Sequence, residues 1–186
     1  MEIGETLYVK DRAAWRAWLV KHYATEREIW LVRYTKASGK EHVPYLEALE
    51  EALCFGWIDS IVKRIDENSY AQRFTPRKEK SPISPLNKEH VRRLMGRGKM
   101  TPAGLHAIRH SFNEKDDTPK IPRDILAALK KDAEAWKHFQ AFPDSYKRVR
   151  IAYIEHRRDD PEEFRRRLAH FLKMTANGKR FGFLRD

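Results

Sequence analysis

Basic and hydroxyl side chains cluster between residues 73 and 87, where their types suit the binding of an anion. The cluster contains arginines, lysines, serines and an asparagine: Arg73, Arg77, Lys78, Lys80, Ser81, Ser84 and Asn87. A helix that begins at Asn87 would add free backbone N–H groups and the positive end of its dipole. Such groups together hold phosphates and carboxylates. We therefore predict a ligand-binding surface in this segment, and we include Trp57, Asp59 and Thr75 in it.

The same side chains also have structural interpretations, which stay open at this point. Serine and asparagine side chains cap turns. Arg73 pairs with Asp59 if their two strands form a hairpin. Lys78 and Lys80 protect a sheet edge from pairing with another chain.

Asp59 offers an alternative based on catalysis. It lies two residues from Trp57, so both side chains share one face of a strand. A carboxylate beside a large aromatic ring can serve as a general acid or base, which would make the chain an enzyme. The structural interpretation is a core Trp57 and an Asp59 paired with Arg73 or Lys63, and we favour it because structural ion pairs are common. The sequence thus favours a binding protein over an enzyme.

The single cysteine and a pair of histidines add no further chemistry. Cys54 lies between Leu53 and Phe55, which predicts a buried, unreactive thiol and excludes an internal disulfide. His106 and His110 are four residues apart on a predicted helix, but no third metal ligand accompanies them. We therefore predict no metal site, no cofactor and no set of catalytic residues.

The charge balance favours negatively charged partners. Lys and Arg number 38 against 27 Asp and Glu, which gives a net charge of +11 in 186 residues. Such a balance attracts nucleic acids, acidic lipid surfaces and phosphorylated ligands, or it serves solubility alone. Four basic residues of the last predicted helix suit nucleic acid in particular: Arg165, Arg166, Arg167 and Lys173. The alternative is an amphipathic helix whose apolar stripe packs on a core.

Hydrophobic periodicity and turn residues predict the elements that position these groups. The expected elements are helices over 11–23 and 44–56, strands over 29–35, 57–65 and 70–75, a proline-rich loop over 76–87, and helices beyond it. Asp11 is expected to cap the first helix, Gly56 to end the second in a left-handed conformation, and Asp160-Pro161 to begin the last. The sequence therefore predicts an α+β fold: a small three-stranded antiparallel sheet with helices, followed by a mostly helical C-terminal half.

The expected domain organisation follows from the same pattern. Residues 1–112 form an α+β module with the hairpin and the basic loop, 113–120 form a polar linker, and 121–186 form a helical C-terminal region. One compact unit is the alternative. The first residues lack the pattern of an export signal, and no apolar stretch approaches the ~20 residues of a membrane span. We expect a cytoplasmic protein without a transmembrane segment.

Three groups of residues occur in an order and spacing that are typical of one bacterial family. They are the stretch 52–60 (ALCFGWIDS), the stretch 73–77 (RFTPR) followed by Ser81, Ser84 and Asn87, and the set Leu94, Gly98, Met100 and Gly104. In these residues the chain resembles the YdeI/OmpD-associated family, also labelled bacteriocin-protection proteins. The segment at Ser145 and the Arg-rich last helix extend the likeness to nearly the whole chain.

The chain departs from the family pattern at two places. Ile83 stands where the family usually has a tryptophan, and Glu162-Glu163-Phe164 stands where it often has Glu-Thr-Arg. Roles of that tryptophan or of the Thr-Arg pair are therefore not carried over. The resemblance implies protection against bacteriocins or cationic antimicrobial peptides, without an established reaction or cofactor.

The sequence supports one main prediction of function and two alternatives. The main prediction is a non-enzymatic binding or stress-protection protein that recognises an anionic ligand. The first alternative is nucleic-acid binding through the basic last helix. The second is an enzyme that uses Asp59 as its acid or base.

Overall fold

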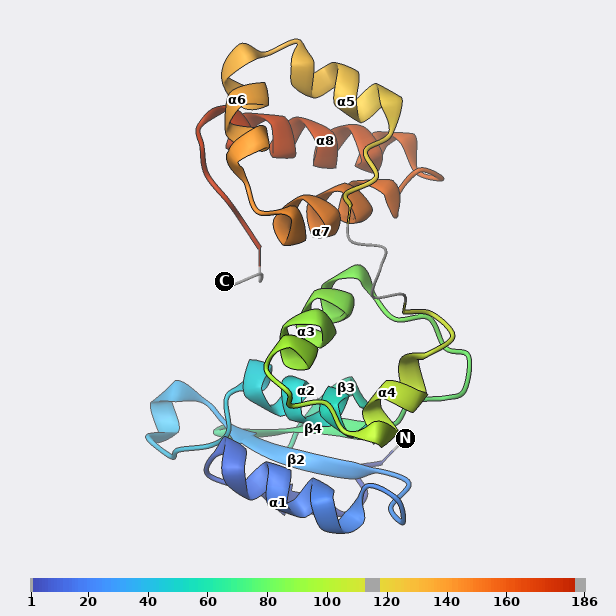
Figure 1. Ribbon diagram of the computed structural model, residues 1–186. Coiled ribbons are helices and arrows are strands. Elements are labelled where there is room, and N and C mark those ends of the chain that lie inside the picture. Colours follow the sequence, from blue (N-terminus) through green and yellow to red (C-terminus); the bar gives the residue numbers. More distant parts are fainter. Residues whose placement is uncertain (1, 113–117, 183–186) are drawn as a thin grey trace. The chain divides into compact units, whose positions relative to one another are not determined.

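The computed structural model describes residues 2–112 and 118–182, and these fall into two compact units (Figure 1). The first unit comprises Met1–Ile83 and His90–Phe112, and the second comprises Ser84–Glu89 and Asn113–Asp186. Most of the predicted linker at 113–120 lies outside the described residues. Within the described ranges, no helix has the length and apolarity that a membrane span requires.

The first unit contains a sheet of four strands in the described residues, whereas the sequence predicts three. The strands are β1 (Thr6–Tyr8), β2 (Ile29–Tyr34), β3 (Trp57–Arg64) and β4 (Ser69–Pro76), in the order β1-β2-β4-β3. β2, β4 and β3 are antiparallel neighbours, as predicted, but β1 pairs parallel to β2 and makes the sheet mixed. The prediction of an antiparallel three-stranded sheet was wrong because three residues are too few to show a periodic pattern.

Helices α1 and α2 pack together on one face of this sheet. The helical elements before residue 112 are α1 (Arg12–His22), a 3₁₀ turn η1 (Lys36–Ser38), α2 (Tyr45–Cys54), α3 (Pro85–Gly96) and α4 (Pro102–Ile108). Asp11 caps α1 as predicted, because its carboxylate accepts a hydrogen bond from the N–H of Ala14 at 2.8 Å. The indole of Trp15 donates to the carbonyl oxygen of Ala48 in α2 at 3.0 Å, and Trp15, Ala48 and Phe74 share one apolar core.

The end of α2 lies very close to the start of α4. The Thr101 hydroxyl caps α4 by accepting from the N–H of Gly104 at 3.2 Å, and it donates to the carbonyl oxygen of Cys54 at 2.6 Å. A Cβ atom on Gly104 would lie 2.2 Å from that same oxygen, so a side chain does not fit there. Gly56, after α2, has a φ of +76°, which agrees with the predicted left-handed helix end.

A buried ionic cluster joins α1, α2 and α3 in the first unit. Glu50 and Glu51 in α2 are almost fully buried. Arg12 Nε donates to Oε1 of Glu51 and Arg16 donates to Oε2 of Glu51, each at 2.5 Å. The Arg93 guanidinium donates to Oε1 of Glu50. Two carboxylates at this depth need opposite charges close by, and the neighbouring helices provide them.

The basic loop ends at Ser84, three residues earlier than predicted. α3 begins at Pro85, and the hydroxyl of Ser84 accepts a hydrogen bond from the N–H of Asn87 at 3.2 Å. A serine followed by proline at the first helical position is a strong start signal, because proline lacks the N–H that would otherwise need a partner. Asn87 therefore lies inside the first turn and does not begin the helix.

The second unit is helical in its described part. Its further helices are α5 (Arg123–Lys130), α6 (Ala133–Ala141), α7 (Asp144–Glu155) and α8 (Pro161–Ala176). In this unit α8 contacts each of α5, α6 and α7 (Figure 1). Asp160 caps α8 through the N–H of Glu163 at 3.1 Å, as predicted. Phe139, Tyr146 and Phe171 are fully buried members of its core.

Candidate functional site

Arg73, the first residue of the predicted binding surface, is paired with a carboxylate. Its Nε donates to Oε2 of Glu28 at 2.8 Å, and a terminal nitrogen donates to the same oxygen. This contact lowers the pKa of Glu28. The predicted pairing with Asp59 is not formed, because Asp59 lies opposite Phe74 in the sheet and Arg73, one residue before, faces the other side.

Asp59 and Trp57 make structural contacts of their own. Oδ2 of Asp59 accepts from the hydroxyl of Tyr45 at 3.0 Å and from Nε2 of Gln72 at 2.8 Å. Burial, with a contribution from Asp59, raises the pKa of Tyr45 to about 12. Trp57 is buried and donates its indole N–H to the carbonyl oxygen of Tyr23 at 3.0 Å. The hypothesis of an enzyme based on Asp59 gains no support from this geometry.

Arg77 stabilises its own loop. A terminal nitrogen donates to the carbonyl oxygen of Pro82 at 2.8 Å and to that of Ser81 at 3.2 Å. Burial lowers the pKa of Arg77. Thr75 is half-buried on β4, and Ser84 and Asn87 belong to the second unit. The predicted surface is thus divided among separate contacts, and its two arginines are held by different partners.

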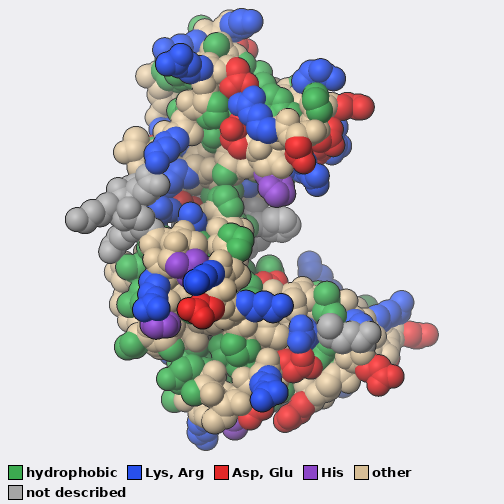
Figure 2. Space-filling view, turned by 90° about the vertical axis from the view of Figure 1, so that its right-hand side faces the viewer, with side chains coloured by type: hydrophobic (Ala, Val, Ile, Leu, Met, Phe, Trp, Pro, Cys, Tyr) green, Lys and Arg blue, Asp and Glu red, His purple; other side chains and the backbone are tan. Residues whose placement is uncertain are grey.

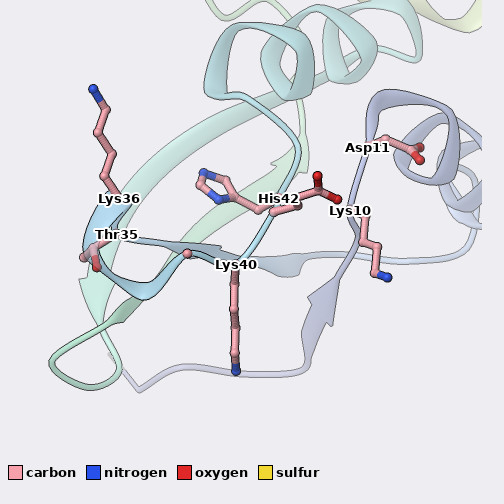
Figure 3. Close-up of a pocket in the computed structure, with 8 residues that line it drawn as sticks. Lys10, Asp11, Thr35, Lys36, Lys40 and His42 are labelled. Atoms are coloured by element: carbon pink, nitrogen blue, oxygen red, sulfur yellow. The ribbon is translucent and has the colours of Figure 1, made fainter.

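A basic pocket of about 560 Å³ lies in the first unit and is drawn in Figure 3. Its lining includes Lys10, Lys36, Lys40 and His42. Figure 3 shows that the Lys36 and Lys40 chains extend in opposite directions, so their ammonium groups do not converge. The Lys40 ammonium instead lies 4.8 Å from the centre of the Tyr34 ring. Burial, with the charge of Arg33 as a smaller cause, lowers the pKa of His42.

The basic residues of α8 are partly paired. Arg166 Nε and Arg167 Nε donate to the two oxygens of Glu163 at 2.6 and 2.7 Å, and these contacts lower the pKa of Glu163 to about 2. Arg165 and Lys173 are exposed. Two of the four arginines and lysines predicted to bind nucleic acid are therefore neutralised within the helix.

The thiol is buried, as the sequence predicts, and the two histidines do not share a helix. Cys54 is fully buried, and burial raises its pKa to about 11, which disfavours the reactive thiolate. α4 ends at Ile108, so His110 is not on the helix that carries His106. Across the part of the chain that the structure describes, no group of three or more His, Cys, Asp or Glu side chains is placed to hold a metal ion.

A larger pocket, of about 850 Å³, lies in the second unit. We call it the Arg150 pocket and define it by its lining: Ser84, Pro85, Leu86, Val149, Arg150, Ala152, Tyr153, Glu155, His156, His170, Phe181 and Gly182. Most of these residues come from α7 and from the chain after α8. The volume lies in the range of about 300–1,000 Å³ that is typical of small-molecule sites.

Arg150 is the unusual member of this lining. The residue is only 8% exposed, and its Nε is buried without a hydrogen-bond partner. Among the described residues, no carboxylate forms an ion pair with its guanidinium. Three aromatic rings surround it instead, with their centres 5.8, 5.4 and 5.0 Å away in Tyr146, Tyr153 and Phe181. Burial lowers the pKa of Arg150, because the apolar surroundings disfavour its charged form.

Arg148, two residues earlier on α7, shows what a compensated arginine looks like in the same unit. Its Nε and a terminal nitrogen donate to the two oxygens of Glu89, each at 2.7 Å. Both side chains are largely buried. This is the bidentate pairing that usually accompanies a buried guanidinium. Arg150 is also buried, but no carboxylate among the described residues pairs with it. It is therefore a stronger candidate than Arg148 for contact with a ligand.

Tyr153 is itself held in place by a second arginine. The Arg167 guanidinium lies 3.8 Å from the centre of the Tyr153 ring and donates to the Tyr153 carbonyl oxygen at 2.7 Å. Arg167 also pairs with Glu163. Arg167, predicted as a nucleic-acid contact, therefore supports one of the rings around Arg150.

Comparison with known families identifies the chain. The model of a domain of unknown function, DUF8412, matches residues 7–107, which is more than half of the chain. The chain belongs to this family. The model described as bacteriocin-protection, YdeI or OmpD-associated matches residues 118–178 and confirms the resemblance seen in the sequence. A search of curated proteins and a search of solved structures each found no match.

The two matches divide the candidate residues between them. The predicted surface around Arg73 and Arg77 lies in the DUF8412 match, whereas Arg150 and Tyr153 lie in the bacteriocin-protection match. Arg150 is not among the residues predicted from the sequence. Its signal is a basic residue on the apolar face of α7, with Tyr146 four residues before it and Tyr153 three residues after it. A charged residue inside an apolar stripe is rare enough to mark a candidate site.

Proposed function

We propose that this chain is a non-enzymatic binding protein of the bacteriocin-protection type, and that it holds an anionic ligand in the Arg150 pocket. One observation carries the proposal: Arg150 is buried, lines a pocket, and has no counter-ion among the described residues. An unpaired buried charge is unfavourable, and an anion in the pocket would compensate it. The family match over 118–178 supports the link to bacteriocin protection, because it includes Arg150.

A small anion fits this protein better than a polymer such as nucleic acid. Nucleic acid needs an extended surface of unpaired basic groups. On the face shown in Figure 2, acidic side chains lie beside basic ones, so the positive charge is spread out there. On α8, Arg166 and Arg167 are paired with Glu163. A single buried guanidinium in a pocket suits a small ligand instead.

The proposal is tested by thermal unfolding in the presence of different anions at constant ionic strength. Suitable probes are phosphate, acetate, adenosine monophosphate and 3-phenylpropionate. We expect at least one of them to raise the unfolding midpoint of the natural chain and to have no such effect on Arg150→Met, since binding to the folded state at 100 times Kd adds about 2.7 kcal/mol. Arg165→Met, which removes an exposed charge from α8, is the control and should respond like the natural chain. A natural chain that responds to none of the anions contradicts the proposal.

The protective role has its own test in cells. Bacteria that produce the chain are expected to survive a cationic antimicrobial peptide at higher concentrations than bacteria that produce Arg150→Met. The two proteins are first shown to accumulate in folded form to the same level. Equal survival under those conditions would show that protection does not depend on Arg150, which contradicts this part of the proposal.

A further inference from the structure

Arg150 is the only arginine or lysine in the lining of the Arg150 pocket, and no carboxylate among the described residues pairs with it. The lining contains one arginine and one carboxylate, Arg150 and Glu155, together with two histidines, His156 and His170. Glu155 is already paired, because Arg158 Nε donates to its Oε1 at 2.8 Å. Arg158 also donates to both oxygens of Asp124, at 2.6 and 2.8 Å. The one carboxylate of the lining therefore has its own partner, and Arg150 offers a single guanidinium group, which suits a ligand with one negative charge.

The walls of the pocket favour an apolar ligand body next to that charge. Apolar and aromatic side chains supply half of the lining residues: Pro85, Leu86, Val149, Ala152, Tyr153 and Phe181. Contact with such walls is favourable for an apolar group and unfavourable for additional charges, which would lose their hydration. A phosphate dianion lacks the apolar body that these walls favour, and both of its charges would lose hydration beside them.

The guanidinium itself is arranged before any ligand arrives. The rings of Tyr146, Tyr153 and Phe181 pack around it. The backbone of Gly182, with a φ of +89°, lies so close that a Cβ atom there would be 2.7 Å from a terminal nitrogen of Arg150. A fixed planar guanidinium offers two parallel N–H groups, which match the two oxygens of a carboxylate.

From these observations we infer that the Arg150 pocket binds a monocarboxylate joined to an apolar or aromatic body. The inference rests on the proposed function and specifies its ligand. Two sources share this chemistry, a free carboxylic acid and the C-terminal residue of an apolar peptide. The positive charge, the apolar walls and the volume apply equally to both, and the experiment separates them.

Isothermal titration calorimetry of the full chain compares ligands that differ in one property. 3-Phenylpropionate and its neutral amide form one pair of ligands that differ in charge. Gly-Gly-Phe and the same tripeptide with an amidated C-terminus form a second pair, which represents a peptide end. Inorganic phosphate lacks the apolar body. We expect at least one of the two carboxylates to bind about tenfold or more tightly than its own amide and than phosphate. Tighter binding of the tripeptide identifies a peptide end, and tighter binding of 3-phenylpropionate identifies a small acid; each supports the inference.

Three variants locate the binding at the pocket. Arg150→Met is expected to weaken carboxylate binding about tenfold or more, and Arg150→Lys to weaken it less, because lysine keeps the charge but lacks the paired N–H groups. Ala152→Phe keeps Arg150 and fills the pocket, so it should also lose binding, and it provides the test if Arg150→Met does not fold. Arg165→Met is the matched control and should bind like the natural chain.

The possible failures are distinguishable. If phosphate binds as tightly as the carboxylates and its binding depends on Arg150, the carboxylate inference is overturned while the anion site stands. If the amides bind as well as the acids, the charge of the ligand is irrelevant and the inference is overturned. If no probe binds, or if binding does not depend on Arg150 and Ala152, both the inference and the proposed function fail.

Discussion

Arg148→Met is expected to lower the free energy of unfolding by about 3–5 kcal/mol, whereas Arg150→Met is expected to leave it unchanged or to raise it by up to about 2 kcal/mol. The two arginines lie two residues apart on α7, and each substitution replaces a guanidinium group with the same uncharged methionine side chain. They differ in their partners. Arg148 donates to both oxygens of the buried Glu89, whereas Arg150 has no carboxylate among the described residues.

The opposite directions follow from what each substitution leaves behind. Without Arg148, the Glu89 carboxylate keeps its burial and loses its bidentate partner, which is strongly destabilising. Without Arg150, the folded protein loses a charge that its surroundings already disfavour, as the lowered pKa of Arg150 indicates. Contacts of the guanidinium with aromatic rings are each worth about 0.5–2 kcal/mol. Methionine keeps the apolar part of these contacts, and relief from several kcal/mol of desolvation offsets the rest.

Amide hydrogen exchange in α6 and α8, recorded at increasing urea concentrations, measures the free energy of unfolding of the second unit in both variants. The comparison is decisive because a structural arginine and a ligand-binding arginine predict different signs. If Arg150→Met destabilises this unit as much as Arg148→Met does, then Arg150 is a structural residue, and this result contradicts a ligand site in the Arg150 pocket.

Glu51→Gln is expected to destabilise the first unit by about 3–5 kcal/mol. Glu51 is only 2% exposed and accepts hydrogen bonds from Arg12 and from Arg16, each at 2.5 Å. Glutamine removes the carboxylate that Arg12 and Arg16 share, and only Arg12 keeps a second carboxylate partner among the described residues, Glu50 at 2.9 Å. Tryptophan fluorescence during urea unfolding reports this change, since Trp15, Trp18, Trp30 and Trp57 all belong to the first unit.

Glu47→Gln on the same helix is the control for Glu51→Gln. Glu47 lies in the first turn of α2, so its loss removes only a favourable contact with the helix dipole, worth about 0.3–1 kcal/mol. Equal stabilities of the Glu51→Gln and Glu47→Gln proteins would show that the buried cluster does not contribute to folding as its geometry indicates.

The sequence predicted those elements whose signals are local. The cap at Asp11, the hairpin of β3 and β4, and the Asp160-Pro161 start of α8 each depend on a few adjacent residues, and each is present. β1 was missed because its formation depends on pairing with β2, which lies more than twenty residues away. The start of α3 was misplaced because Ser84 and Asn87 are both good capping residues, and the proline after Ser84 decides between them.

The two arginines of the predicted surface have separate partners for a different physical reason. Sequence spacing places Arg73 and Arg77 near each other, but it does not reveal their partners. Arg73 meets Glu28, which is 45 residues away in the chain, and Arg77 turns back onto the carbonyl groups of its own loop. Arg150 was overlooked because a lone arginine between apolar residues resembles the edge of a helix face, and its lack of a counter-ion is visible only in three dimensions.

An anion in the Arg150 pocket would contact the guanidinium, and the ¹H–¹⁵N resonance of the Arg150 Nε–H group reports that contact directly. Absence of this resonance in Arg150→Met assigns it, and the corresponding resonance of exposed Arg165 serves as an internal reference. Addition of 3-phenylpropionate is predicted to shift the Arg150 resonance in a saturable manner and to leave that of Arg165 in place, while the neutral amide shifts neither. If the Arg150 resonance does not shift at millimolar concentrations of the carboxylate, of phosphate and of adenosine monophosphate, the chain has no anion site at Arg150.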